Sequence, residues 1–459
     1  MKITKIVVLC LIPIFLISFG LASCKAAATT TTAAETTAAT TTTAAETTAA
    51  EKQITITIWD HQVGDPYKNA FAELIPAYEK LHPNIKIERT AYNYADIEDK
   101  EKAAIQSNTL PDLFGLHKGP QVEEMSKAGL LFNWADVINA DPEWKGWLGA
   151  SLNMTGEYNQ AGQMIGLPYD TFGCFAWGFS NVLESMKSSK AEVLSLKTIK
   201  DLADFAQKLK SEGYKKWWIS TGLKGGTYLR EFFYVFVFQQ TQPVNKAYKA
   251  EFQQDGVKWT DKEFVVAAQA IKDFSKAFRE DVMNLDYQTD HYGFLQNLDT
   301  WGSAMDGSWS TGVIASNPDA INNVFAFYLP ACTEGAANNV LEADVGQMVG
   351  MKPDNPNKEE IIKFAKFLNS PDCTRYMLKN LITPAGKWSD DWQSLVKYPI
   401  FGEMQDLMQK SIISPWVTYT GEIQTSLINN LSQVFMGTLT PDQAMANVQA
   451  DTEAYWKSQ

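Results

Sequence analysis

Hydrophobic and polar positions alternate from Ile54 to Trp59, and this period of two predicts a β-strand. Asp65-Pro66 then offers a helix N-cap and a first-turn proline, and apolar residues follow at helical spacing. The same reading predicts strands over 85–88 and 111–115 and a helix over about 95–107. An order of strand, helix, strand, helix, strand is typical of a mainly parallel sheet covered by helices, so we predict an α/β fold.

The later part of the chain is richer in helical patterns. Thr198 with Asp201 and Thr260 with Glu263 have the spacing of capping boxes. A strand is predicted over 325–330, ending at a proline, and helices are predicted over 357–369, after Ser370-Pro371 and after Thr440-Pro441.

The first 23 residues have the pattern of an export signal. Lys2 and Lys5 precede an apolar run over 6–17, which leads to the small residues of Leu21-Ala22-Ser23-Cys24. This pattern indicates a cleaved leader and resembles a bacterial lipobox, in which Cys24 is acylated, for example with palmitate, and becomes the new N-terminus. The alternative is a transmembrane anchor, which needs about 18–20 apolar residues and is disfavoured by the early Pro13.

Residues 24–52 form a low-complexity segment. The sequence TTTTAAETTAA occurs at 29–39 and again at 40–50, and no aromatic or large aliphatic residue lies between 25 and 53. Such a segment buries no core, so we predict a disordered tether that holds a folded domain off the membrane. A helical repeat is disfavoured by the threonines, and a glycosylated stalk stays open as an alternative.

Composition narrows the class of protein. About 400 residues remain after the tether, enough for two domains, and the formal charge of −13 argues against a nucleic-acid partner. Cys174, Cys332 and Cys373 are widely spaced, so they form no metal or redox motif, although one disulfide can form. The membrane is therefore expected to be reached through the lipid anchor only.

Aromatic residues make up 12% of the chain and suggest a ligand class. Many tryptophans stand beside Gly, Asp, Ser or Pro, as in Trp59-Asp60 and Ser308-Trp309-Ser310, which favours loops and element ends over core positions. Pyranose rings stack on indole while their hydroxyls bind planar polar groups. An aromatic-rich cleft therefore favours a carbohydrate ligand.

The order of these segments resembles the extracellular solute-binding proteins that serve ABC importers, in particular the sugar-binding branch that includes maltose-binding protein. No single motif is specific, but six occur in the family's order along the whole mature domain. The segments are 56–59 with 77–85, 111–114 with 129–131, 165–170, 179–181, 302–309 and 437–444. Ser180-Asn181 departs from the Tyr-Asn that is more usual there.

The resemblance implies a two-lobed periplasmic-binding-protein-like fold with a hinge of two to three crossovers. By position, we expect crossovers near Pro168–Thr171, Leu329–Ala331 and Thr383–Pro384. Lobe one would comprise 53–170 plus 331–383, and lobe two 171–330 plus 384–459. Each lobe would be a mainly parallel sheet flanked by helices, with the ligand between them.

The candidate ligand-binding residues lie at strand ends and crossovers. Trp59 and Asp60 end the first strand, and His117 and Lys118 end the third. Tyr169 and Asp170 lie on the first crossover and either bind ligand or fix the hinge. The resemblance makes Trp309 an aromatic wall of lobe two and Trp388 a further wall residue.

We therefore predict a monomeric, lipid-anchored receptor on the outer face of a bacterial cytoplasmic membrane. It would capture a carbohydrate by hinge closure and deliver it to an ABC permease, without a cofactor. No catalytic motif such as G-x-S-x-G or H-E-x-x-H occurs, so no enzyme is predicted. The alternatives are a receptor for another solute such as a polyamine, and a surface glycoside hydrolase or polysaccharide-binding protein.

Overall fold

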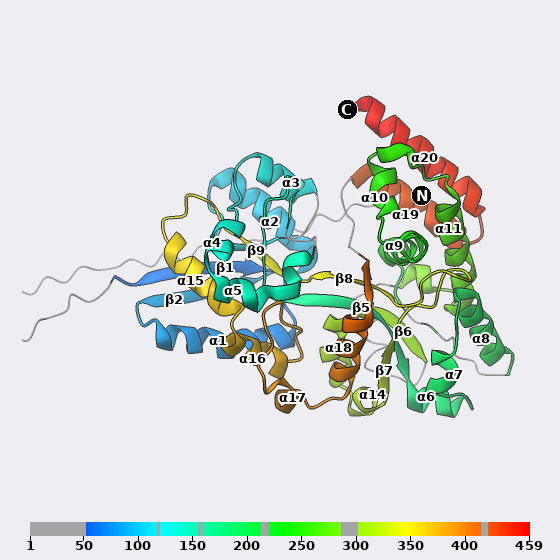
Figure 1. Cartoon of the computed structure of the whole chain (residues 1–459), viewed down its shortest axis with the longest axis horizontal. Helices are drawn as coiled ribbons and strands as arrows, with labels where there is room; N and C mark the ends of the chain where they lie inside the picture. The colour runs from blue at the N-terminus through cyan, green and yellow to red at the C-terminus, as the bar shows by residue number, and fades with distance from the viewer. Residues whose placement is uncertain are drawn as a thin grey trace, which may run out of the picture. The chain divides into compact units, whose positions relative to one another are not determined.

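The structure of the chain is a computed structural model (Figure 1). It describes residues 52–116, 120–154, 158–159, 161–212, 219, 221–285, 302–414 and 421–459. The predicted leader, the tether and Cys24 lie outside the described residues, as do His117 and Lys118.

The first sheet has five strands in the order β2-β1-β3-β9-β4. β1 runs parallel to both β2 and β3, whereas β9 is antiparallel to β3 and β4. These strands are β1 (Ile54–Asp60), β2 (Ile85–Ala91), β3 (Leu113–Leu116), β4 (Leu167–Pro168) and β9 (Met348–Gly350). The three strands predicted in this part of the chain are thus confirmed.

Helices pack on this sheet around a core that includes Tyr78, Trp134 and Phe364. α1 contacts α16, and α16 contacts α15. Figure 1 shows α16 beside α1. The N-cap of α1 is Gly64 and not the expected Asp65, which is the first helical residue. The helices are α1 (Asp65–Leu81), α2 (Tyr94–Ser107), α3 (Pro120–Lys127), α4 (Ala135–Ala140), α5 (Pro142–Leu148), α15 (Lys358–Leu368) and α16 (Pro371–Lys379).

The second sheet is dominated by antiparallel pairs. Its strands are β5 (Thr171–Phe179), β6 (Ser303–Gly307), β7 (Val324–Phe327), β8 (Val340–Val345) and β10 (Ile412–Ser414). The nine-residue β5 pairs antiparallel with β6, β7 and β8, and only the β8–β10 pair is parallel. The expectation of a mainly parallel sheet in each lobe is therefore wrong in detail, because β4 continues into β5 and β8 into β9 as two antiparallel strands that run through both sheets.

Four helices, α9, α11, α19 and α20, contact one another beside this sheet (Figure 1). The predicted capping box at Thr198 is confirmed, and the helix predicted after Thr440-Pro441 also begins with a capping box. The one at Thr260 is wrong, because Asp261 is the N-cap and the Glu263 carboxylate binds Lys246. The helices are α6 (Ser180–Ser185), α7 (Lys190–Leu194), α8 (Ile199–Ser211), α9 (Thr227–Thr241), α10 (Lys246–Glu251), α11 (Lys262–Phe274), α13 (Thr311–Ala315), α14 (Pro318–Asn323), α17 (Trp392–Leu395), α18 (Ile400–Lys410), α19 (Gly421–Phe435) and α20 (Pro441–Ser458).

The chain passes between the two sheets at three places, which we call crossovers. The first joins β4 to β5 through Tyr169–Asp170, and the third includes Pro384, which pairs with Asp170. The second, expected at Leu329–Ala331, lies between β8 and β9 at Gly346–Gln347. The expectation fails because β8 follows that position and still belongs to the second sheet.

The two mixed sheets, each with flanking helices, give the α/β two-lobed fold that was predicted. Within the described residues, no helix has the length and apolar character needed to cross a membrane.

Candidate functional site

The carboxyl end of β1 places Trp59 and Asp60 at an edge of the first sheet, where ligands of open α/β sheets bind. Asp60 is buried, and its carboxylate accepts two hydrogen bonds from Arg89, from Nε at 2.6 Å and from Nη2 at 2.7 Å. It also accepts one from the backbone N–H of Gln62 at 2.8 Å. The role that these contacts give Asp60 is to fix Arg89 and the loop after β1.

Two pairs of half-buried aromatic rings lie at this edge and at the start of β5. Trp59 meets Tyr92 edge to face, with ring centroids 5.2 Å apart. Phe172 meets Trp309 in the same way at 5.5 Å. Both tryptophans keep part of their surface accessible, so either can stack against an apolar face of a bound molecule.

Trp309 is positioned by the residue two places before it. A Cβ atom on Gly307 would lie 2.1 Å from the ring of Trp309, so the indole rests directly on the glycine backbone. The 3-10 turn Ser308–Ser310 that carries Trp309 is tied back to Asp306, which accepts a hydrogen bond from the hydroxyl of Ser310. The backbone of Gly307 and the turn Ser308–Ser310 therefore hold the ring in place.

All three crossovers meet at Asp170. Its carboxylate accepts hydrogen bonds from the hydroxyl of Tyr67 on α1 and from the backbone N–H of Gln347 on the second crossover. Its carbonyl accepts from the N–H of Gly346 at 3.0 Å, and its backbone pairs with Pro384 of the third crossover. Of the two roles considered for Asp170, the contacts support fixing the hinge.

Burial raises the pKa of Asp170 to about 7, while the hydrogen bonds from Tyr67 and Gln347 lower it. Tyr169 beside it is also buried, and burial together with the charges of Asp60 and Asp170 raises the pKa of its hydroxyl. That hydroxyl has no hydrogen-bond partner among the described residues. A ring packed against Phe71, at 6.1 Å, holds Tyr169 in the core rather than at a ligand surface.

Several residues of this region were not found from the sequence. Arg89 lies opposite Ile58 in the β1–β2 register, and Gln347 contacts the imidazole of His61 at 2.6 Å. Phe172 directly follows the crossover at the start of β5. The strand predicted over 85–88 stops one residue before Arg89, and its pairing with the first strand was the signal that could have placed Arg89 near Asp60.

Trp388 lies elsewhere. Its indole N–H donates to the carbonyl of Pro384 at 3.3 Å, and its ring meets Trp392 at 5.1 Å. It also lines an open hollow of about 300 Å³ beside the ion pair of Arg375 with Asp391. The structure thus joins Trp388 to the third crossover and to α17, not to the pair formed by Phe172 and Trp309.

Reactive and metal-binding groups are sparse in the described residues. Cys174, Cys332 and Cys373 are free thiols, and no described group of three or more His, Cys, Asp and Glu is suited to a metal ion. What the region offers is accessible indole surface beside buried, hydrogen-bonded carboxylates, a combination that binds polar molecules with apolar faces.

Several solved structures share this fold. A structure from work on xylan utilization by Caldanaerobius polysaccharolyticus is 19% identical, with a TM-score of 0.72 over 86% of this chain and 99% of its own. A chitin oligosaccharide binding protein is 17% identical, with a TM-score of 0.69 over 88% and 98% of the two chains. An ABC substrate-binding protein from Listeria monocytogenes in complex with cycloalternan is 16% identical, with a TM-score of 0.69 over 88% and 100%.

Sequence comparison gives the family directly. No curated protein matches the chain in sequence. The sequence profile of the bacterial extracellular solute-binding proteins, however, matches residues 64–372, which is more than half of the chain. The chain belongs to the family of bacterial extracellular solute-binding proteins.

Proposed function

We propose that this protein is the lipid-anchored receptor of an ABC importer and that it captures a carbohydrate, in particular an oligosaccharide, between its lobes. The observation that carries the proposal is the supported, partly accessible indole of Trp309 on Phe172, with the second ring pair of Trp59 and Tyr92 at the end of β1. Structures of the same fold are described as binding chitin oligosaccharide and cycloalternan, which are carbohydrates with apolar ring faces.

The mechanism that we propose is closure of the lobes about the three crossovers. A ligand that contacts both lobes binds the closed state more tightly and therefore shifts the population toward it. We assign residues 53–170 and 346–383 to lobe one and residues 171–345 and 384–459 to lobe two. These bounds follow the observed crossover at Gly346–Gln347.

The closed receptor would then dock on a membrane-embedded permease, which would take the solute. Acylation of Cys24 and the tether of residues 24–52 would keep the receptor at the outer face of the membrane and leave slack for docking. We assign no catalytic step, because the buried carboxylates Asp60 and Asp170 are both engaged by hydrogen-bond donors of the protein.

Thermal unfolding of the purified protein with a panel of xylan-, chitin- and α-glucan-derived oligosaccharides tests the proposal. A bound sugar at 100 times its Kd stabilises the protein by about 2.7 kcal/mol and raises the Tm. The sugar must be recovered unchanged, because release of shorter products would show a glycoside hydrolase. If no sugar raised the Tm while a polyamine did, the carbohydrate assignment would be wrong.

A further inference from the structure

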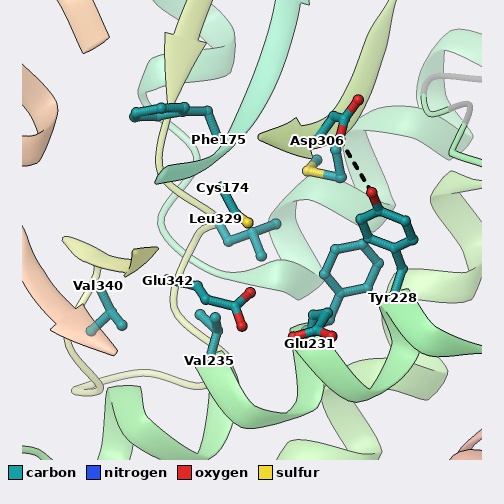
Figure 2. Close-up of a pocket in the computed structure, with 11 residues that line it drawn as sticks. Cys174, Phe175, Tyr228, Glu231, Val235, Asp306, Leu329, Val340 and Glu342 are labelled. Atoms are coloured by element: carbon teal, nitrogen blue, oxygen red, sulfur yellow. Dashed lines mark hydrogen bonds between the residues drawn. The ribbon is translucent and has the colours of Figure 1, made fainter. Parts of the chain in front are cut away.

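An acidic cavity lies between α9 and the second sheet (Figure 2). Its volume is about 30 Å³, enough for a group the size of water or ammonium but not for a sugar ring. Polar groups from four elements line it, and apolar side chains such as Phe232 and Val235 form the rest of its wall. The polar residues are Cys174 of β5, Tyr228 and Glu231 of α9, Asp306 of β6 and Glu342 of β8.

Two of these carboxyl groups, those of Glu231 and Glu342, are hydrogen-bonded to each other in the wall of the cavity. Glu231 and Glu342 are 8% and 3% exposed, and Figure 2 shows both side chains pointing into the same space. Glu231 forms an ion pair with Arg230, whose Nη1 atom also donates to Gln424 at 2.9 Å. The Oε1 atom of Glu342 is buried and has no hydrogen-bond partner among the described residues, whereas the same carboxyl group accepts a hydrogen bond from the thiol of Cys174. One carboxyl group therefore points into the cavity without a cation of its own.

The cavity is next to the proposed ligand surface. Cys174 lies two residues after Phe172, so both side chains project from the same face of β5. Asp306, which accepts a hydrogen bond from the hydroxyl of Tyr228 at 3.2 Å, also binds Ser310 in the turn that carries Trp309. A solute stacked on Trp309 thus has this cavity beside one end.

We propose that the cavity is an end pocket of the solute site and binds a protonated primary amine of the solute. The three N–H groups of the ammonium would donate hydrogen bonds to Glu342, to Glu231 and to the hydroxyl oxygen of Tyr228. This inference rests on the proposed function, since it places the amine on the captured molecule, and it narrows the solute to an amino-bearing one such as a non-acetylated amino sugar.

Charge balance distinguishes an amine from the other small groups. Arg230 neutralises Glu231 and a proton neutralises Glu342 in the empty pocket, so a group that replaces this proton must carry a positive charge, which a neutral hydroxyl does not. An anion would meet only acidic groups. A divalent metal lacks the cluster of three ligands that it needs in the described residues. An ammonium group restores neutrality and supplies donors to the unpartnered oxygen.

Binding should be linked to release of a proton. Burial and the charge of Glu231 raise the pKa of Glu342, so the empty pocket keeps a proton on this pair. The other titratable groups that face the pair are Arg230 on α9, Asp306 on β6 and Cys174 on β5. Because the amine replaces the shared proton, its affinity should rise as the pH rises.

The test is a thermal-unfolding and calorimetric titration of the purified protein with methylammonium chloride. Tetramethylammonium chloride, which is too large and has no N–H donor, and potassium chloride are added at the same ionic strength as comparisons. We expect methylammonium alone to raise the Tm, with release of about one proton, measured as a heat that depends on the ionisation enthalpy of the buffer. Equal responses to the three salts would overturn the inference.

Single-residue variants test whether methylammonium binds at Glu342. Glu342→Gln should lower the affinity for methylammonium by about tenfold or more, the loss expected for a hydrogen bond between charged groups. Glu88→Gln, on the exposed face of β2, is the matched control and should bind as the parent protein does. An unchanged affinity in Glu342→Gln would overturn the inference, and the buffer-dependent heat of the parent protein tests it without a variant.

The outcomes separate this inference from the proposed function. A protein that binds neutral oligosaccharides and ignores methylammonium keeps its carbohydrate function and loses the amine pocket. A protein that binds methylammonium and no oligosaccharide keeps the pocket and loses the carbohydrate assignment.

Discussion

The guanidinium of Arg89 donates two hydrogen bonds to the carboxylate of Asp60, at 2.6 and 2.7 Å. Its Nη2 atom also donates to the carbonyl of Gln62 at 2.8 Å. The guanidinium carbon lies 4.2 Å from the ring centroid of Phe71. β1, β2 and α1 are thereby joined at the edge where Trp59 is placed. The pair fixes the loop after β1 at this edge, and each of its two charges is balanced by the other.

Replacement of Arg89 should therefore destabilise the fold. Arg89→Met leaves Asp60 buried without its partner, which costs about 3–5 kcal/mol. Urea unfolding at pH 7 measures the loss. Arg89→Lys keeps the charge without the paired geometry and should fall between the parent and Arg89→Met. An Arg89→Met variant as stable as the parent would show that the pair is dispensable.

A second prediction concerns the hinge. Tyr67→Phe removes the hydroxyl that donates to Asp170 and should lower the free energy of unfolding by about 1–3 kcal/mol, because both groups are buried. It should also change the solute affinity, since the bond joins α1 to the first crossover. The control is Tyr376→Phe on α16, a partly buried tyrosine of the same core that is not part of a crossover. Equal effects of the two variants on affinity would contradict a hinge role for Tyr67.

The pH dependence of stability gives a third prediction. Burial raises the pKa of Asp170 to about 7, above the usual value near 4 of an unfolded aspartate. The native state then binds more protons than the unfolded state between these values, so stability is greatest below about pH 4 for this group and is lost as the pH rises through 7. Between pH 5.5 and 7.5 its contribution should fall by about 2 kcal/mol.

Asp170→Asn removes that titration while keeping an oxygen acceptor. Urea unfolding of parent and variant at the two pH values should show a steeper decline for the parent. The comparison is between slopes, because other buried acids such as Glu101, whose pKa burial raises to about 8, titrate equally in both proteins. Parallel slopes would mean that Asp170 does not hold its proton in the folded state.

The sequence predicts the first sheet well because its signals are local. The alternation of Ile54 to Trp59 and the helical spacing after Asp65 need only neighbouring residues to be correct, and β1 and α1 lie where expected. The capping boxes at Thr198 and Thr440 are equally local. Capping at Thr260 failed because Glu263 finds a distant partner, Lys246, which no local spacing reveals.

The second crossover could not be placed for a related reason. β8 carries Glu342 and Asp344 at inward positions, so its hydrophobic pattern is broken although every residue of the strand is buried. Pro330 therefore looked like the end of the second sheet. The site shows the same limit: Trp309 could be chosen through the family resemblance together with its glycine and serine neighbours, but its partner Phe172 depends on tertiary packing.

A fourth prediction tests the anchor. Labelling of expressing bacteria with radioactive palmitate should mark the protein, and Cys24→Ser should lose the label and be released from the membrane fraction. The control is Cys332→Ser, a thiol of the folded domain, which should keep the label. Label that persists in Cys24→Ser would place the acylation elsewhere, and an unlabelled Cys24→Ser protein that stays in the membrane fraction would identify the leader as an ordinary anchor.

The last prediction tests the ligand surface itself. Trp309→Ala should weaken binding of the oligosaccharide identified in the thermal panel by about tenfold or more, since it removes an aromatic contact and its buried apolar area. The Tm without ligand should change little, because the ring is only half-buried. Isothermal titration calorimetry measures the affinity.

Trp388→Ala is the matched comparison for that experiment. Its ring contacts Pro384 and Trp392, so its removal should lower the Tm and leave the affinity within about threefold of the parent, a difference of under 1 kcal/mol. Unchanged affinity in Trp309→Ala would remove this residue from the site. A larger loss of affinity in Trp388→Ala than in Trp309→Ala would place the ligand surface at the hollow beside the third crossover. The amine pocket would then no longer lie beside the ligand surface.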